Sequence, residues 1–74
     1  MATLKFWMGS VPSNCDACSM ELTDKFYDAK TKFGPWGNLC PACHTNGPGL
    51  GKVGTGLGQG YTKQDDGRWL KTAG

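Results

Sequence analysis

Four cysteines in two C-x-x-C pairs are the residues of this chain that most directly indicate a chemistry. Cys15 and Cys18 form the first pair, Cys40 and Cys43 form the second, and 21 residues separate the pairs. A C-x-x-C turn, or knuckle, lets both sulfurs reach one ion, and two such pairs can surround zinc tetrahedrally at about 2.3 Å. The spacing therefore predicts one shared four-thiolate metal site. Such a site has no open coordination position, so we expect it to be structural and not catalytic.

The identity of the ion is open to three readings. Tetrahedral zinc and tetrahedral iron both accept four thiolates. The segment Cys40–Cys43 resembles a rubredoxin knuckle, but rubredoxins usually carry Gly after the second Cys of each knuckle, where this chain has Ser19 and His44. The same segment with His44 also matches a haem-attachment motif, which would leave the first Cys pair unused and normally requires export. We therefore expect zinc, with iron as the alternative and haem as the third reading.

No arrangement typical of a catalytic centre accompanies the cysteines. His44 is the one histidine, and because it directly follows Cys43, binding to the same ion would strain the backbone. We expect His44 to be an exposed residue beside the metal site. The sequence shows no nucleophile arrangement and no carboxylate pair suited to acid–base chemistry. It therefore predicts a binding module that is not an enzyme and has no small-molecule substrate.

The size and composition of the chain also favour a metal-stabilised domain. Its 74 residues are enough for one domain, and only 38% of them are hydrophobic while 12 are glycine. Chains this short bury little core and usually depend on a metal, disulfides or a partner. The N-terminus has no apolar run of signal-peptide length, and no stretch approaches the roughly 20 apolar residues of a membrane span. We therefore expect a cytoplasmic protein with reduced thiols and no membrane contact.

Short β-hairpins and at most one short helix are expected around the metal site. Aromatic and β-prone residues predict strands, Gly-Pro pairs predict breaks, and the second Cys pair is expected to open a single helical turn. The order knuckle, hairpin, knuckle, short helix is typical of a zinc ribbon or a treble-clef-like domain, and the sequence leaves these two open. Phe26 and Phe33 are candidates to pack over the metal. The predicted elements are a strand at 3–8, hairpin arms at 24–29 and 31–36, and a helical turn at 40–46 that Gly47-Pro48 ends.

Residues 47–60 are a glycine-rich segment, with Gly at seven of the fourteen positions. The segment can be a flexible linker, an ordered loop, or a cradle of backbone N–H groups for phosphate. Its spacing does not match a nucleotide-binding P-loop. The regularly placed Leu50, Val53 and Leu57 favour an ordered loop. We therefore divide a single domain into a four-cysteine zinc-binding core at 1–46 and a glycine-rich loop with a C-terminal hairpin at 47–74, packed on the core or extending from it.

The last part of the chain carries the excess of positive charge. The formal net charge is +2, and because residues 1–46 balance, the excess lies in 47–74. Asp66-Gly67 is a typical hairpin turn, with a short arm on each side. A basic and aromatic surface there would suit nucleic acid, whereas Tyr61 and Trp69 can equally cover a small core. The candidate residues for nucleic-acid or partner binding are Lys52, Tyr61, Lys63, Arg68, Trp69 and Lys71.

About half of the chain resembles a class of small zinc-ribbon-like proteins encoded by tailed bacteriophages; the stretch is FYDAKTKFGPWGNLCPACHTNGPGLGKVGTGLGQGY. These proteins share a D-x-K-T-x-x-G-P-W-x-x-x-C element, a second Cys knuckle and a G-x-G-L-G-T-G-x-G-Q-x-Y run. The first element runs here from Asp28 to Cys40, and the last run ends at Tyr61 with Lys52-Val53 inserted. The resemblance implies a zinc ribbon of viral origin. Most proteins of this class have no assigned activity, so the resemblance implies no biochemical role.

Binding to a host or phage protein is the function that the sequence favours, either to modulate a host enzyme or as a small part of an assembly. The charge is mild, and three Trp in a short chain can anchor an interface. The alternative is a nucleic-acid-binding regulator that uses the basic and aromatic C-terminal region. A rubredoxin-like electron carrier is the third reading, and it requires iron in the four-cysteine site.

Overall fold

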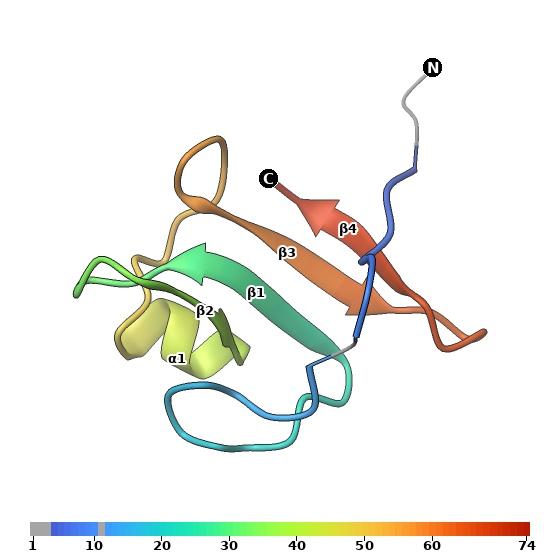
Figure 1. Ribbon diagram of the computed structural model, residues 1–74, viewed down its shortest axis with the longest axis horizontal. Helices are drawn as coiled ribbons and strands as arrows, with labels where there is room; N and C mark the ends of the chain where they lie inside the picture. The colour runs from blue at the N-terminus through green and yellow to red at the C-terminus, as the bar shows by residue number, and fades with distance from the viewer. Residues whose placement is uncertain (1–3, 11) are drawn as a thin grey trace.

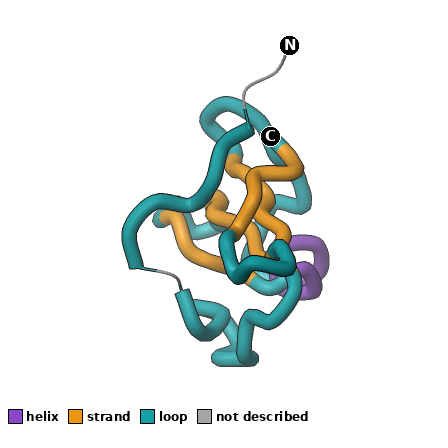
Figure 2. Tube along the Cα trace, turned by 90° about the vertical axis from the view of Figure 1, so that its right-hand side faces the viewer, coloured by secondary structure: helices purple, strands orange, loops and turns teal. Residues whose placement is uncertain are grey.

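An antiparallel sheet of four strands forms the body of the protein in the computed structural model, which describes residues 4–10 and 12–74. The strand order is β2-β1-β3-β4 (Figure 1). One short helix, α1, packs against β1 and β2 on one side of the sheet, and the N-terminal segment crosses the other side (Figure 2). The elements are β1 (Lys25–Lys30), β2 (Trp36–Leu39), α1 (Pro41–Asn46), β3 (Gly58–Lys63) and β4 (Trp69–Ala73).

The predicted first hairpin is present, but its second arm lies farther along the chain. The sequence predicts this arm at 31–36, whereas β2 begins only at Trp36. The residues before it form the turn, in which Thr31 N–H donates to the carbonyl oxygen of Pro35 at 3.1 Å. Gly34 has a φ of +104° and Pro35 lacks an N–H, so both residues suit a turn better than a paired strand. Gly34-Pro35 therefore closes the turn that precedes β2 and does not end a strand.

The same turn separates the two phenylalanines that were expected over the metal. Phe26 lies in β1, is fully buried and belongs to one hydrophobic cluster with Cys15 and Cys40. Phe33 lies in the turn and is 81% exposed, so the prediction that it packs over the metal is wrong. A side chain in a short turn projects away from the sheet that the turn connects, which explains the exposure of Phe33.

The C-terminal hairpin forms as predicted and completes the sheet. β3 and β4 are antiparallel, and Gly67 has a φ of +89° in the turn between them. β3 also pairs with β1, where Tyr61 lies opposite Phe26. The C-terminal strands and the hairpin that precedes the second Cys pair therefore belong to one continuous sheet.

Residues near the N-terminus extend the edge of β4 in place of a full strand. Phe6 forms a single antiparallel bridge with Leu70, and Trp7 N–H donates to the carbonyl oxygen of Trp69 at 2.8 Å. The predicted strand at 3–8 is therefore reduced to one bridge, and its first residue, Thr3, lies outside the described residues. This contact brings the indole ring of Trp7 onto the sheet.

An aromatic cluster forms most of the core between the N-terminal segment and the sheet. Phe26 and Tyr61 stack with ring centroids 5.2 Å apart, and Trp7 meets both rings edge-on at 5.3 Å. Trp69 adds a further edge contact to Phe26 at 5.0 Å. Tyr61 and Trp69 are therefore core residues, 9% and 4% exposed, as in the second of the two readings of these side chains. Such aromatic pairs contribute about 0.5–1.5 kcal/mol each beyond the burial of their area.

The glycine-rich segment is an ordered loop, in agreement with the prediction. Gly54 and Gly58 form an antiparallel bridge, and Lys30 N–H donates to the carbonyl oxygen of Leu57 at 2.9 Å. Gly58 has a φ of +150°, and a Cβ there would lie 2.5 Å from the Cβ of Ala29. Only glycine allows the loop to enter β3 this close to β1. Among the described residues, no helix is long and apolar enough to span a membrane.

Candidate metal centre and a neighbouring groove

The first Cys pair lies on a knuckle that precedes the sheet. Cys15 N–H donates to the carbonyl oxygen of Met20 at 2.8 Å, and Ser19 N–H donates to the carbonyl oxygen of Cys15 at 2.9 Å. Ser19 has a φ of 65°, the left-handed conformation that usually falls to Gly. The tight turn points an amide at a sulfur, since Ala17 N–H donates to Cys15 Sγ at 3.4 Å.

The second Cys pair lies where β2 passes into α1. Leu39 ends β2, Cys40 is the N-cap residue of the helix, and Pro41 occupies the first helical turn. Proline suits this position because the first N–H groups of a helix have no partner within the helix. Cys43 N–H donates to Cys40 Sγ at 3.5 Å, so the capping side chain is itself one of the four clustered thiols. The second pair thus lies at the start of a helix, whereas the first pair lies on a knuckle outside the helix and the strands.

The four sulfur atoms meet at one point, as the spacing predicts. The Sγ atoms of the four cysteines all lie within 4.8 Å of one another. Cys18 Sγ and Cys40 Sγ are 3.8 Å apart. A tetrahedron with metal–sulfur bonds of about 2.3 Å has edges of about 3.8 Å, so this spacing suits a four-thiolate ion. Cys15 and Cys40 are buried, Cys43 is half-buried and Cys18 is exposed.

The pKa values of the thiols indicate how a bound cation would act on this cluster. Burial raises the pKa of the Cys15 thiol, but the backbone N–H groups of Cys40, Cys18 and Ala17 outweigh it and lower this pKa to about 6. At Cys43, burial, hydrogen bonds with the other thiols and the charge of Cys15 raise the pKa to about 12. One thiolate therefore forms readily and makes a further one unfavourable. A bound divalent cation would offset this repulsion, because metal ligation requires the thiols to be deprotonated.

His44 is placed differently from the prediction. It is 4% exposed and not a surface residue, because its ring stacks on Tyr27 of β1 with centroids 4.1 Å apart. Successive helical residues point about 100° apart, so His44 faces the sheet while Cys43 faces the other sulfurs. Its Nε2 lies 3.2 Å from the carbonyl oxygen of Lys52, which can accept a hydrogen bond from a protonated Nε2. The ring therefore ties α1 to the glycine-rich loop and lies outside the four-sulfur cluster.

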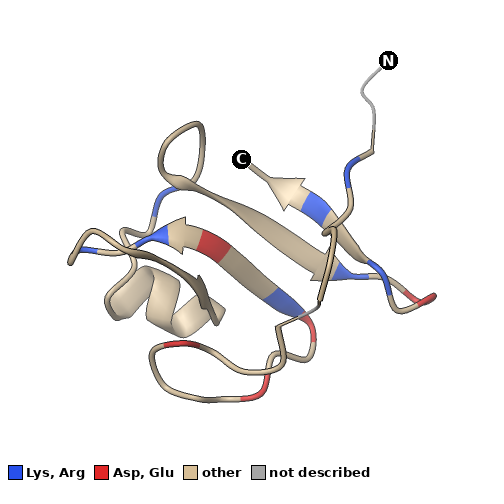
Figure 3. Cartoon of the chain, viewed as in Figure 1, with Lys and Arg blue, Asp and Glu red and all other residues tan. Residues whose placement is uncertain are grey.

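The two aromatic residues proposed from sequence for a basic and aromatic surface, Tyr61 and Trp69, do not lie at the surface. Lys52 lies in the loop between α1 and β3, whereas Lys63 ends β3 and Lys71 lies in β4. Positive residues are accordingly found at both ends of the sheet (Figure 3). Arg68 donates to Asp66 Oδ2 at 2.8 Å, and its guanidinium lies 4.2 Å from the ring centroid of Phe6. The aromatic members of the set, Tyr61 and Trp69, are buried.

A groove with two exposed aromatic side chains lies beside the first knuckle. Its volume is about 730 Å³. Phe33 and Trp36 line it and are 81% and 47% exposed, and Pro35 and Pro48 contribute further apolar surface. This pair is not among the binding residues expected from the sequence, although Gly34-Pro35 between the two aromatics indicates a turn that holds both side chains outward. We call this feature the aromatic groove; it is lined by Asp16, Ala17, Thr31, Lys32, Phe33, Pro35, Trp36, Gly37, Leu39, Gly47 and Pro48.

The protein therefore presents two adjacent features, a four-sulfur cluster and the aromatic groove. Ala17 of the first knuckle and Leu39 at the end of β2 line the groove, so an ion that orders the cysteines also orders part of the groove wall. Four thiolates would complete a tetrahedral coordination shell and leave no position for a substrate.

No protein family, curated protein or solved structure matches this chain.

Proposed function

We propose that the protein is a zinc-stabilised, non-enzymatic module that binds another protein through the aromatic groove. The four-sulfur cluster supports the first half of this proposal, because a closed tetrathiolate site contributes to folding and not to turnover. The exposed pair Phe33 and Trp36 supports the second half. The expected partner is a host or phage protein, in keeping with the resemblance to proteins of tailed bacteriophages.

Zinc is the proposed ion, and a treble-clef-like domain is the proposed fold. A knuckle, the β1–β2 hairpin and a helix whose first turn carries the second Cys pair follow one another in the chain. This order is that of a treble clef, and a zinc ribbon would place the second pair on another knuckle. A rubredoxin-like iron site also calls for two similar knuckles, so the helical second pair favours zinc. Metal analysis separates the two ions, since a ferric tetrathiolate protein is red and a zinc protein is colourless.

The exposed aromatic pair is the observation that carries the binding proposal. Large apolar side chains that gather at one exposed place mark interaction sites more often than isolated ones do. Tryptophan is among the residues that contribute most to protein–protein interfaces, especially beside a pocket. Phe33 and Trp36 lie on either side of Gly34-Pro35 and line the same groove. Binding of a partner would bury the apolar surface of Phe33 and Trp36, which the small core of the protein leaves exposed.

The nucleic-acid alternative has weaker support from the described residues. Stacking on bases needs exposed aromatic rings. Tyr61 and Trp69 lie in the core, and Arg68 already pairs with Asp66. The basic residues of the C-terminal strands thus remain without the aromatic partners that the sequence analysis assigned to them.

Affinity capture from bacterial lysate tests the proposed function. Immobilised zinc-loaded protein is incubated with nuclease-treated lysate at high salt, and wild type is compared with the Phe33→Ala/Trp36→Ala double variant. We expect a defined partner that wild type retains and the double variant loses. Met8→Ala is the matched control, because Met8 is 86% exposed and lies outside the groove.

Two results would count against the proposed function. One is a set of captured proteins that the double variant retains unchanged. The other is tight, steeply salt-dependent binding of labelled DNA or RNA, measured by fluorescence anisotropy, which would favour a nucleic-acid-binding protein. Lys63→Ala should then weaken that binding and reduce its salt slope by about one.

A further inference from the structure

The outer edge of β2 is only partly paired. Thr31 N–H donates to the carbonyl oxygen of Pro35, next to the β1–β2 ladder. Hydrogen-bonded and non-hydrogen-bonded pairs alternate along an antiparallel ladder. The backbone N–H and C=O of Trp36 and Asn38 therefore point away from β1. Asp16 satisfies the backbone groups of Asn38. Its N–H donates to the Asn38 carbonyl oxygen at 2.9 Å, and Asn38 N–H donates to Asp16 Oδ2 at 2.8 Å. The outward N–H and C=O of Trp36 have no such protein partner in the part of the chain that the structure describes.

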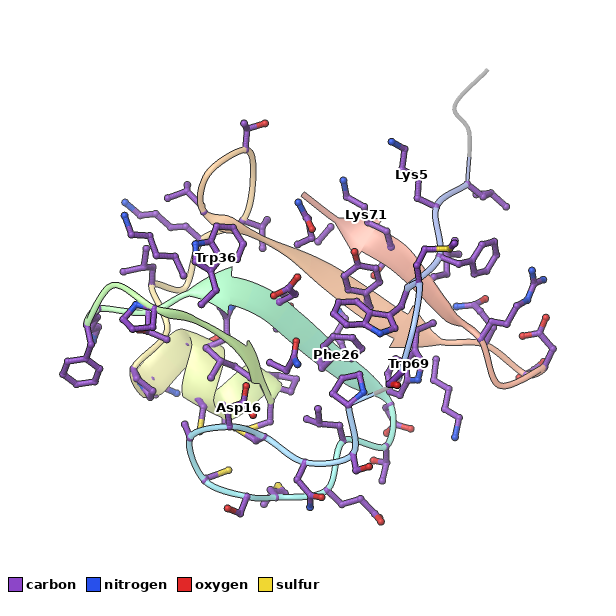
Figure 4. All side chains as sticks on the ribbon, in the orientation of Figure 1. Lys5, Asp16, Phe26, Trp36, Trp69 and Lys71 are labelled. Atoms are coloured by element: carbon purple, nitrogen blue, oxygen red, sulfur yellow. The ribbon has the colours of Figure 1, made fainter. Side chains whose placement is uncertain are left out.

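The aromatic groove runs beside this free edge. Trp36, Gly37 and Leu39 of β2 all line it, and Asp16 and Ala17 of the first knuckle form its opposite end. Figure 4 shows Trp36 and Asp16 near opposite ends of β2. An occupant of the groove would therefore lie along β2, next to the free backbone groups of Trp36 and in line with Asp16.

The end of the groove near Trp36 is positively charged. Lys30 is exposed and lies directly opposite Trp36 across the β1–β2 ladder, and Lys32 lines the groove. Neither lysine forms an ion pair with a carboxylate among the described residues. The carboxylate of Asp16 lies at the other end and already accepts a hydrogen bond from Asn38. The groove thus combines apolar walls with two unpaired positive charges near Trp36.

We propose that an extended acidic segment of the partner protein adds to β2 as a short strand beside Trp36. This inference rests on the proposed function, because it uses the same groove. A peptide residue opposite Trp36 exchanges backbone hydrogen bonds with its N–H and C=O, the two groups that on Asn38 are satisfied by the N–H and the Oδ2 of Asp16. Alternate side chains of an extended peptide point to the same side, so apolar residues enter the groove. An acidic residue then lies next to Lys30 and Lys32.

A second copy of this chain is a poorer occupant of the edge. Pairing two β2 edges would bring two sets of the same lysines, Lys30 and Lys32, into one interface. Like charges placed together in an interface disfavour association. A peptide that carries carboxylates meets the same lysines with opposite charge. Charge complementarity therefore selects an acidic partner segment over self-association.

Short synthetic peptides provide the probe. A bead library carries Val, Ile or Leu at alternate positions and either Glu or Lys at the flanking positions, and it is screened with zinc-loaded protein. We expect enrichment of Glu-flanked peptides that bind at least about tenfold more tightly than their Lys-flanked counterparts. In isotope-labelled protein, these peptides should shift the amide signals of Trp36 and Gly37. N-methylation at one peptide position should weaken binding by about tenfold, because it removes one backbone hydrogen bond to β2.

Charge-reversal variants test the lysines separately from the fold. Both Lys30 and Lys32 are exposed, so Lys30→Glu/Lys32→Glu should fold normally and weaken binding of the Glu-flanked peptides at least about tenfold. The double variant should bind Lys-flanked peptides better than wild type does. Lys63→Glu is the matched control, since Lys63 is exposed at the far end of β3, and its affinity should equal that of wild type.

The outcomes distinguish this inference from the proposed function. Peptides that bind but shift other amides, or that tolerate N-methylation at every position, overturn strand addition and leave the groove as a protein-binding site. Shifts at Trp36 that grow with protein concentration in the absence of peptide identify a second copy as the occupant and also overturn the inference. Failure to enrich any peptide overturns it too. The proposed function itself fails if the groove variants retain the proteins captured from lysate, or if the protein binds nucleic acid tightly with a steep salt dependence.

Discussion

Ser19 is the residue whose backbone conformation suits its side chain least. It is the one non-glycine residue with a positive φ among those that the structure describes, and it directly follows Cys18. The left-handed conformation costs a residue with a Cβ about 1–2 kcal/mol. Gly avoids this cost, but it loses more backbone entropy on folding, which offsets part of the gain in stability. We expect Ser19→Gly to raise the free energy of unfolding of the zinc-loaded protein by about 0.5–1 kcal/mol. Urea denaturation measures the change.

Ser13→Gly is the control for this prediction. Ser13 precedes the knuckle and does not have a positive φ, so Gly there should only add entropy to the unfolded chain and lower stability. Equal losses of stability in the two variants would show that the conformation of Ser19 carries no cost.

Asp28 places a carboxyl group in the middle of β1. Burial raises the pKa of this group above its ordinary value. The stabilisation linked to a raised carboxyl pKa is present below the unfolded-state pKa and is lost as the pH rises through the folded-state pKa. At neutral pH the ionised group therefore lowers stability, and we expect Asp28→Asn to raise the Tm of the zinc-loaded protein. Asp24→Asn, at an exposed position, should leave the Tm unchanged, and an equal or lower Tm for Asp28→Asn would refute the assignment.

At this scale the sequence predicts the four-cysteine cluster and misses the partners of individual side chains. The four cysteines follow from a local spacing, because each C-x-x-C turn brings its own two sulfurs together. The burial of His44 depends on Tyr27, which lies on another element and is 17 residues away in the sequence. Local spacing carries no information about such a contact.

Elements with strong local signals are predicted closely, whereas the strand at 3–8 is reduced to one bridge and the second arm of the first hairpin is displaced by turn chemistry. β1, the helix that carries the second Cys pair and the C-terminal hairpin lie close to their predicted places. β2 is displaced because the residues between Thr31 and Pro35 close a turn, and their aromatic content alone resembles a strand. That displacement matters for function, since it leaves Phe33 and Trp36 exposed on either side of Gly34-Pro35.

Gly58 tests how tightly the glycine-rich loop is built into the sheet. Its φ is +150°, and an added Cβ would lie 2.5 Å from Ala29 Cβ and 2.7 Å from Ala29 Cα. Backbone atoms cannot give way as a flexible side chain can, so we expect Gly58→Ala to lower the free energy of unfolding by about 2–4 kcal/mol. Denaturant unfolding with zinc in excess measures this loss.

Gly56→Ala separates the steric contribution from the backbone contribution. Gly56 also has a positive φ, +78°, but a Cβ there would meet nothing within 4 Å. Its substitution should cost only about 1–2 kcal/mol. If both variants lose the same stability, the close approach of the loop to β1 contributes nothing.

At the scale of the whole molecule, one sheet unites the hairpin that leads to the second Cys pair with the C-terminal strands. The strand order β2-β1-β3-β4 places β3 next to β1, although the glycine-rich loop and α1 separate them in sequence. Neither this pairing nor the contact of Trp7 with Tyr61 follows from local periodicity, because both join distant segments. The sequence accordingly predicts most of the elements and the four-cysteine cluster but not the sheet order or the groove.

Loss of the metal should unfold this sheet. Structural zinc contributes about 10–16 kcal/mol in small zinc-finger peptides, as much as the whole stability of a typical domain. Cys15 and Cys40 share the hydrophobic cluster with Phe26, so the site and the core are one unit. We expect Cys15→Ser or Cys40→Ser, or a strong chelator, to collapse the dispersion of the amide NMR signals. Added zinc should restore the chelated wild type, and native dispersion in either variant would contradict a structural role for the ion.

X-ray absorption at the metal edge tests the central claim most directly, that four thiolates hold one zinc ion in a closed site. The measurement reports the element, the ligand atoms and their distances together. The proposed function predicts a zinc edge, and the four-cysteine cluster predicts a single shell of four sulfurs at about 2.3 Å. An iron edge would contradict the proposed ion and revive the electron carrier. A zinc shell with nitrogen or oxygen at about 2.0–2.2 Å would contradict the closed site, because His44 or a solvent molecule would then occupy a position assigned to a cysteine.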